Sequence, residues 1–141
     1  MTNNSCHVVV GRLLEIRLRD GYRSIADIDE MAVMLSSAIA QASTSKPLVI
    51  VADWRACKVL SPSVSSRATA MMKSTNDRVE RSAILHGAEH PTSVMQLFRL
   101  VKETEASHRR LFTDASALHD WVGEILDADE RNRLREFLAE R

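Results

Sequence analysis

The sequence predicts one α/β domain spanning residues 1–141, a mixed sheet of about five strands with helices packed against it and an extra C-terminal helix. Two observations predict this fold. Short runs of β-forming residues alternate with amphipathic helical segments in the order β-β-α-β-α-β-α-β-α-α, which is typical of a largely parallel sheet. The chain also has the length of one ordinary domain and no linker rich in proline, glycine or serine.

Two short strands are expected first, over residues 6–10 and 13–19. In the second, Leu14, Ile16 and Leu18 alternate with charged residues. Strict alternation predicts a strand with one buried and one solvent-facing side, as on an edge or antiparallel strand. The charged positions expected on the solvent-facing side are Glu15, Arg17 and Arg19.

An amphipathic helix is expected next. Asp27 and Glu30 have the spacing of a capping box, which predicts that the helix begins there. Its apolar positions recur every three or four residues, at Ile28, Met31, Leu35, Ala38, Ile39 and Ala42. This period predicts that one side of the helix is buried against the sheet.

Residues 48–53, Leu-Val-Ile-Val-Ala-Asp, are apolar up to the last position and predict a buried central strand. The strand brings Asp53, with Arg55 just beyond it, to its carboxyl end, where open α/β sheets build their sites. A helix is expected to begin soon afterwards, with Ser61 as N-cap and Pro62 at its first position. The apolar side of that helix contains Val64, Ala68, Met71 and Met72.

Two further strand and helix pairs follow, with strands predicted over 81–86 and 110–113. The helix after the first strand is expected to bury Val94, Leu97, Phe98 and Val101. Asp114 is the predicted N-cap of the helix after the second, which is expected to bury Leu118, Trp121, Val122 and Ile125. The basic step at Arg109 and Arg110 is expected to cap the C-terminal end of the preceding helix.

Residues 127–141 form a predicted terminal helix. Asp127 and Glu130 again have capping-box spacing, and a narrow apolar stripe follows them among alternating charges. The stripe consists of Leu134, Phe137 and Leu138. Two arrangements are open: the stripe packs on the domain's own sheet or fourth helix, or it docks on a second subunit.

Composition restricts the classes of function. Nineteen basic residues balance nineteen acidic ones, so no overall field attracts nucleic acid, and no stretch is long and apolar enough to span a membrane. Cys6 and Cys57 fit neither a zinc nor a disulfide framework, and residues 1–5 contain neither a basic segment nor an apolar run, so no leader segment is expected. We therefore expect a cytoplasmic protein with reduced thiols. The phosphate-loop, GxGxxG and GxSxG motifs are absent, which argues against standard nucleotide and hydrolase chemistry. We expect a protein that is not an enzyme and holds no cofactor.

Three local signatures carry a family resemblance. They are the strand at 79–85, the strand and helix at 110–122, and the strand ending in Asp53 with its serine-rich helix start. In this order and spacing the chain resembles the SpoIIAA-like family within the STAS group, the fold of bacterial anti-sigma-factor antagonists. The resemblance covers about residues 8–126 and leaves the terminal helix outside.

The resemblance implies a regulatory role. In STAS antagonists the turn after the central strand commonly carries an aspartate and adjacent serines, one of which a partner kinase phosphorylates to switch binding. Laid over that turn, this chain has Ser61-Pro62-Ser63, so a proline replaces one of the usual serines. SpoIIAA-like proteins are also similar in fold to lipid-binding CRAL-TRIO domains, which implies a second class of function.

The turn after the central strand contains the main candidate site. Asp53, Arg55 and Lys58 either converge on a ligand or form a structural ion pair beside Trp54. Ser61 acts as N-cap or belongs to a partner-binding face, and Ser63 and Ser65 are the candidate phosphorylation sites, since a helix N-terminus favours phosphate.

A second group of candidate residues follows the next strand. His86 and His90, with Glu89 between them, are either a zinc-binding set or a solvated turn. They lie on a predicted loop and not on one side of a helix, so we expect no metal. His86 and His90 remain candidates for binding a partner or ligand.

The function predicted from the sequence is a non-enzymatic regulatory or protein-binding module, with a partner protein or a second copy bound at residues 53–65 and 86–92. The alternative is a carrier or sensor for a small ligand, a lipid or an organic anion, held in an apolar pocket with Arg55 and His86 at its mouth.

Overall fold

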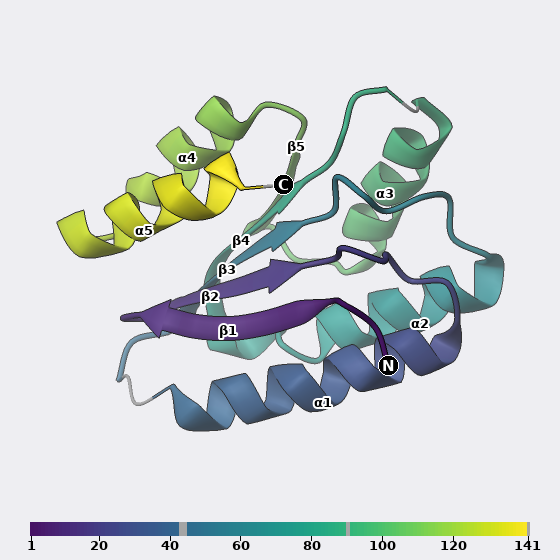
Figure 1. Ribbon diagram of the computed structural model, residues 1–141, viewed down its shortest axis with the longest axis horizontal. Coiled ribbons are helices and arrows are strands. Elements are labelled where there is room, and N and C mark those ends of the chain that lie inside the picture. The colour runs from purple at the N-terminus through teal and green to yellow at the C-terminus, as the bar shows by residue number, and fades with distance from the viewer. Residues whose placement is uncertain (43–44, 90, 141) are drawn as a thin grey trace.

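Five strands form one mixed sheet in the sequential order β1-β2-β3-β4-β5 (Figure 1). The computed structural model describes residues 1–42, 45–89 and 91–140. β1 pairs antiparallel with β2, and the remaining neighbours pair parallel. The strands are β1 (Ser5–Val10), β2 (Leu13–Arg17), β3 (Leu48–Asp53), β4 (Val79–Leu85) and β5 (Arg109–Phe112). The α/β class and the five-stranded mixed sheet are therefore as predicted.

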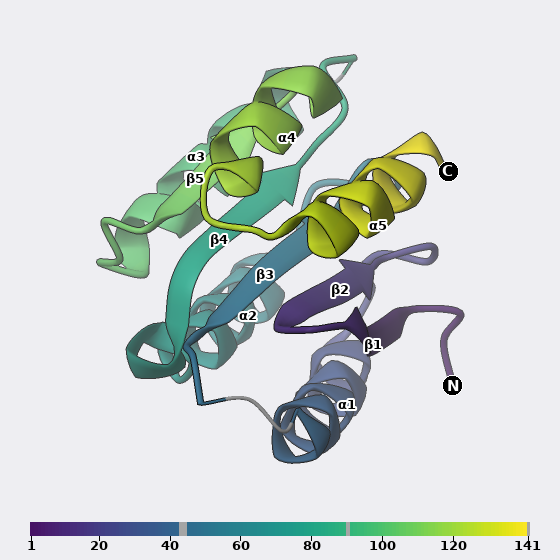
Figure 2. The same cartoon turned by 90° about the vertical axis from the view of Figure 1, so that its left-hand side faces the viewer.

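The helices divide between the two faces of the sheet. Right-handed crossovers between successive neighbouring strands place their helices on one face, and α1, α2 and α3 contribute to the core there. α4 and α5 cover the opposite face, so that α1 and α5 lie on opposite sides of the sheet (Figure 2). The helices are α1 (Ile25–Gln41), α2 (Pro62–Lys73), α3 (Pro91–Glu103), α4 (Ala115–Gly123) and α5 (Ala128–Ala139).

β3 is the central strand, with the predicted bounds, and all six of its residues are buried. Alternate side chains enter opposite cores, because successive residues of a strand point to opposite faces. Ile50 packs with α1, α2 and α3, whereas Val49 and Val51 pack with α4 and α5. β3 therefore anchors both layers of helices.

β2 does not have the predicted solvent-facing side. It lies inside the sheet, antiparallel to β1 as its pattern allowed, and all five of its residues are buried. The reason is α5, which covers the face carrying Glu15 and Arg17. Arg133 of α5 donates from Nε and Nη2 to the two carboxylate oxygens of Glu15, each at 2.7 Å. A bidentate ion pair thus replaces the water expected around Glu15.

Most predicted helix starts are confirmed. The side chains of Ser61 and Asp114 cap α2 and α4, and Asp127 forms a capping box with Glu130 at α5. The predicted start of α1 is wrong. Its N-cap is Ser24, whose side chain accepts from the backbone N–H of Asp27, so Asp27 already lies in the first turn.

Two predictions about α3 are also wrong. Phe98 is 57% exposed, because Leu97 and Leu100 are the side chains that α3 buries. Arg109 caps α2 and not α3. Its guanidinium donates to the carbonyl oxygen of Met72 at 3.2 Å and to Oδ1 of Asn76 at 3.0 Å, just beyond the last turn of α2.

α5 docks on its own domain, which is the first of the two arrangements left open by the sequence. Leu134, Phe137 and Leu138 are buried against α4 and the sheet. At the start of α5, a carboxylate oxygen of Glu130 accepts from the backbone N–H of Arg12 at 2.9 Å. The adjoining Gly11 has φ 56°, and a side chain there would collide with the Glu130 carboxylate.

The substitution Leu134→Ala tests this docking. We expect it to lower the free energy of unfolding by about 2–5 kcal/mol, because Leu134 is fully buried and its removal leaves a cavity. Urea denaturation measures the change. The exposed neighbour Arg135 is the control, and Arg135→Ala should change stability by about 0.5 kcal/mol or less. A wild-type denaturation midpoint that rises with protein concentration would instead indicate docking on a second subunit.

Candidate functional site

The carboxyl ends of the four parallel strands meet at one edge of the sheet, and the predicted site residues follow two of these ends. Asp53 is the last residue of β3, with Arg55 and Lys58 in the loop after it. His86 follows β4 directly. The parallel register places the end of β3 opposite the end of β4, so the topology brings these segments together as predicted.

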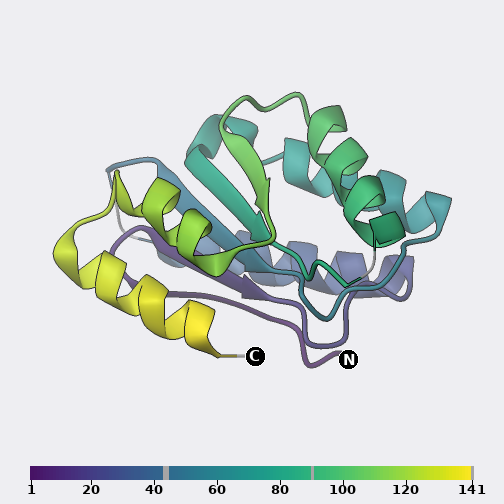
Figure 3. The same ribbon diagram turned by 90° about the horizontal axis from the view of Figure 1, so that it is seen from above.

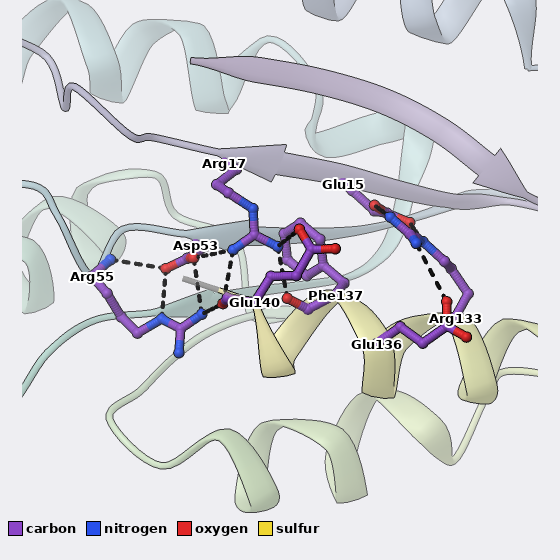
Figure 4. Close-up of polar contacts among 8 residues, drawn as sticks. All are labelled: Glu15, Arg17, Asp53, Arg55, Arg133, Glu136, Phe137 and Glu140. Atoms are coloured by element: carbon purple, nitrogen blue, oxygen red, sulfur yellow. Dashed lines mark hydrogen bonds and ion pairs between the residues drawn. The ribbon is translucent and has the colours of Figure 1, made fainter. Parts of the chain in front are cut away.

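Asp53 lies between Arg17 of the neighbouring strand β2 and Arg55 of the loop after β3 (Figure 4). Nη1 of Arg17 donates to its Oδ2 at 2.5 Å. Nε of Arg55 donates to Oδ1 at 2.9 Å, and Nη2 of Arg55 donates to Oδ2 at 3.0 Å. The backbone N–H of Arg55 donates to Oδ1 as well, at 3.0 Å. The side chain of Asp53 is only 6% exposed, so its acceptor sites face other groups of the chain.

The same two arginines hold the C-terminal end of α5. Nη2 of Arg17 donates to the carbonyl oxygen of Phe137 at 2.7 Å, and Nη1 donates to that of Glu140 at 3.1 Å. Arg55 also donates to the carbonyl oxygen of Glu140. The guanidinium carbon of Arg17 lies 4.1 Å from the centre of the Phe137 ring. Of the two expectations for Asp53 and Arg55, a ligand site and a structural ion pair, the structure shows the ion pair. The end of α5 lies at the strand ends, where a ligand would have bound.

The arginines keep Asp53 ionised. Burial alone would raise its pKa, but the hydrogen bonds and charge of Arg55, with the charge of Arg17, outweigh burial and hold the pKa below its usual value. Burial also lowers the pKa of Arg17, against the opposing effect of Asp53. The arrangement is thus a charged cluster that depends on all three members.

Lys58 lies apart from this cluster. Its exposed side chain lines a surface hollow of about 440 Å³ together with Val59, Glu89 and Thr92. Trp54, which directly follows β3, is buried and packs edge-on against Tyr22 with ring centres 5.4 Å apart. Trp54 therefore covers the edge of the core, whereas Lys58 faces solvent.

His86 is buried, with Nδ1 2.6 Å from the carbonyl oxygen of Gly87. The space that it lines beside Trp54 and Cys57 is about 10 Å³, far below the roughly 300–1,000 Å³ of typical ligand pockets. His90 lies outside the described residues. Within the described ranges, no group of three or more His, Cys, Asp or Glu side chains is placed to hold a metal ion.

The serines occupy the first turn of α2. Ser61 is the N-cap, and its hydroxyl lies 3.4 Å from that of Ser63, which is exposed. Ser65 is half-buried and faces α3. The structure therefore gives Ser61 the capping role that the sequence predicted, and separates the environments of Ser63 and Ser65.

A groove that the sequence interpretation missed runs between α2 and α3, with a volume of about 680 Å³. These helices lie away from α4 and α5 when the molecule is seen from above (Figure 3). We call this hollow the α2–α3 groove; its lining includes Ser65, Thr69 and Lys73 of α2 and Met95, Arg99 and Glu103 of α3. The sequence did contain a signal for this arrangement. Leu97 and Leu100 are three positions apart and define the buried side of α3, which leaves Met95 and Phe98 on an exposed side.

The two thiols are buried. Burial raises the pKa of Cys6 to about 12 and also raises that of Cys57, so neither thiol is activated as a nucleophile.

Comparisons of the chain with protein-family models, with curated proteins and with solved structures found no match. In the part of the chain that the structure describes, no helix has both the length and the apolar character needed to cross a membrane.

Removal of the central carboxylate should destabilise the domain. We expect Asp53→Ala to lower the free energy of unfolding by about 3–5 kcal/mol, because it leaves two buried or half-buried arginines without their carboxylate. Asp120, exposed on α4, is the control, and Asp120→Ala should cost about 0.5 kcal/mol or less. Chemical denaturation measures both, and equal stability of the two variants would contradict the role assigned to Asp53.

The pH dependence of stability provides a separate test. The folded-state pKa of Asp53 lies below its unfolded value of about 3.9, so between the two the unfolded state binds more protons and stability rises with pH. The contribution of Asp53 is therefore present above about pH 4 and is lost as the pH falls through the folded-state pKa. In denaturation curves, the stability difference between wild type and Asp53→Asn should shrink below about pH 4; a constant difference would contradict this.

Proposed function

We propose that this chain is a non-enzymatic regulatory module of the SpoIIAA-like type that binds a protein partner. The binding surface consists of the loop 54–61, the start of α2 and the outer side of α3. We call it the α2–α3 surface; it includes the groove defined above.

The observation that carries the proposal is a group of three exposed apolar side chains, which we call the apolar patch. Val59 is 55% exposed, Met95 73% and Phe98 57%. Val59 lines the hollow beside Lys58, Met95 lines the α2–α3 groove, and both hollows reach Thr92. Phe98 lies one helical turn beyond Met95. Contiguous apolar side chains with a polar surround are typical of protein interaction sites, whereas single ones are common on any surface.

The state of the polar residues at the strand ends supports a role other than catalysis. Asp53, Arg17 and Arg55 are occupied with one another and with α5. His86 is buried beside a carbonyl oxygen, and burial keeps Cys57 protonated. A general base or nucleophile needs access to a substrate, so these groups favour a binding module.

Regulation by phosphorylation fits the same surface. Ser63 is exposed at the start of α2, and Ser65 lines the groove. A phosphate on either serine adds about two negative charges at a helix N-terminus, close to the apolar patch. The intact mass of protein purified from its source, measured under denaturing conditions, tests whether phosphate is present.

The alternative function, a carrier for a lipid or organic anion, is favoured by one observation. The volume of the α2–α3 groove, about 680 Å³, lies within the range of ligand pockets. A mass increment present only under native conditions, and identified as a small molecule, would support the carrier.

Loss of the apolar patch should abolish partner binding without loss of stability. We expect the double variant Met95→Ser/Phe98→Ser to lose a partner that wild-type protein retains from an extract of its source, because both side chains are exposed and available for contact. Thermal denaturation should show nearly unchanged stability. Affinity capture with quantitative mass spectrometry makes the comparison.

Val33 supplies the matched control for that experiment. It is 71% exposed on α1 and lines neither the α2–α3 groove nor the hollow beside Lys58, so Val33→Ser removes a similar apolar side chain elsewhere. Equal retention by Met95→Ser/Phe98→Ser and Val33→Ser would count against the proposed surface.

A further inference from the structure

The α2–α3 groove has the length of a short helix. Its lining extends from Pro62 to Lys73 on α2 and from Thr92 to Glu103 on α3, eleven residue steps on each helix. At 1.5 Å per residue this is about 16 Å, or three helical turns. Both helices follow strands of the parallel part of the sheet, so they begin at the same end of the groove.

The groove offers apolar surface from both helices. The small Ala70 and Met95, both exposed, contribute to its lining, whereas Leu100, which also belongs to the lining, is only 1% exposed. Ser66 and Thr69 are also short side chains, which allow another backbone to come close. Helices bind in such grooves through apolar side chains spaced three or four residues apart.

The charges of the groove are incompletely compensated. Lys73 on one wall and Arg99 on the other have no ion-pair partner among residues 1–42, 45–89 and 91–140. Among the described residues of the lining, Glu103 is the single acidic one. The N-terminal ends of α2 and α3, with their positive dipole ends, add to this field at the other end of the groove.

We propose that the α2–α3 groove binds an acidic amphipathic helix of a partner protein. The apolar side of that helix contacts Met95 and Ala70, and its flanking carboxylates pair with Lys73 and Arg99. Its negative C-terminal end lies toward the N-termini of α2 and α3, so it runs antiparallel to them. This inference rests on the proposed protein-binding function and specifies the partner's chemistry.

A second copy of this chain fits the groove less well. The outward side of α1 carries the exposed Val33, but its exposed acid Asp29 is already paired with Arg67 of α2 at 2.9 Å. The apolar stripe of α5 is buried. Charge complementarity therefore favours a different protein.

Two synthetic peptides of about 14 residues test the proposal. Both have leucine at helical spacing of three and four; one has glutamate at the remaining positions and the other lysine. In fluorescence anisotropy titrations we expect the acidic peptide to bind at least about tenfold more tightly, with affinity that falls as salt is added. Chemical-shift changes on addition of the acidic peptide should map to α2 and α3.

Charge reversal on the groove walls should remove the preference for the acidic peptide. Lys73→Glu/Arg99→Glu should weaken binding of the acidic peptide about tenfold or more, since two attractions become repulsions. Arg135→Glu is the matched control, because Arg135 is an exposed cation of α5 on the opposite face of the sheet. It should leave the affinity unchanged, and circular dichroism confirms that each variant is folded.

The serines provide a second pair of variants. Ser65→Glu places a carboxylate on the groove wall and should weaken binding of the acidic peptide. Ser63 lies outside the lining, so Ser63→Glu should weaken that binding less. Equal effects of Ser63→Glu and Ser65→Glu would contradict the assignment of the groove.

Three outcomes would overturn the inference. They are equal affinity for the two peptides, chemical-shift changes that map away from α2 and α3, and binding of neither peptide by a protein that does bind laurate, a fatty acid used as a probe for the small-ligand carrier. The last result would favour the small-ligand carrier. If Met95→Ser/Phe98→Ser loses the natural partner while Lys73→Glu/Arg99→Glu keeps it, the protein-binding function stands and the acidic helix is wrong. If both variants keep the partner, the proposed function itself fails.

Discussion

The salt-bridged carboxylate of Asp53 is the constraint on which the rest of the structure depends. Buried charges are costly unless they are paired and hydrogen-bonded, and Asp53 meets this condition through Arg17 of β2 and Arg55 of the following loop. The spare donors of these arginines are satisfied by the end of α5. One carboxylate therefore joins two central strands, a loop and the C-terminal helix, and fixes which face of the sheet α5 covers.

This arrangement determines where binding is possible. In open α/β sheets the carboxyl ends of the strands are the usual place for a ligand, but here the polar groups of β2 and β3 are occupied by α5. On the opposite face, α2 and α3 leave a groove with Met95 exposed beside it. The two layers of helices therefore differ in what they do. α4 and α5 complete the core and occupy the strand ends, whereas α2 and α3 leave an accessible surface.

Local signals were sufficient to predict most elements. The uniform apolar run fixed both bounds of β3, and the caps at Ser61, Asp114 and Asp127 act within three residues of themselves. The face of β2 was predicted wrongly because its alternation has the period of a half-exposed strand, while the partner of Glu15 is 118 residues away in sequence. The α2–α3 groove was missed for a related reason. It forms only where α2 and α3 lie side by side, and the apolar pattern of each helix in the sequence does not show how the two helices are placed.

The distance in sequence between α5 and its partners has a consequence for synthesis on the ribosome. The chain emerges from its N-terminus, so β2 and β3 are available long before residues 128–139. Until those residues emerge, one face of the nascent sheet exposes Glu15 and Arg17 beside uncovered apolar side chains of the second core. Such surfaces are prone to misassociation during translation, and the last helix ends this vulnerable period by closing that face.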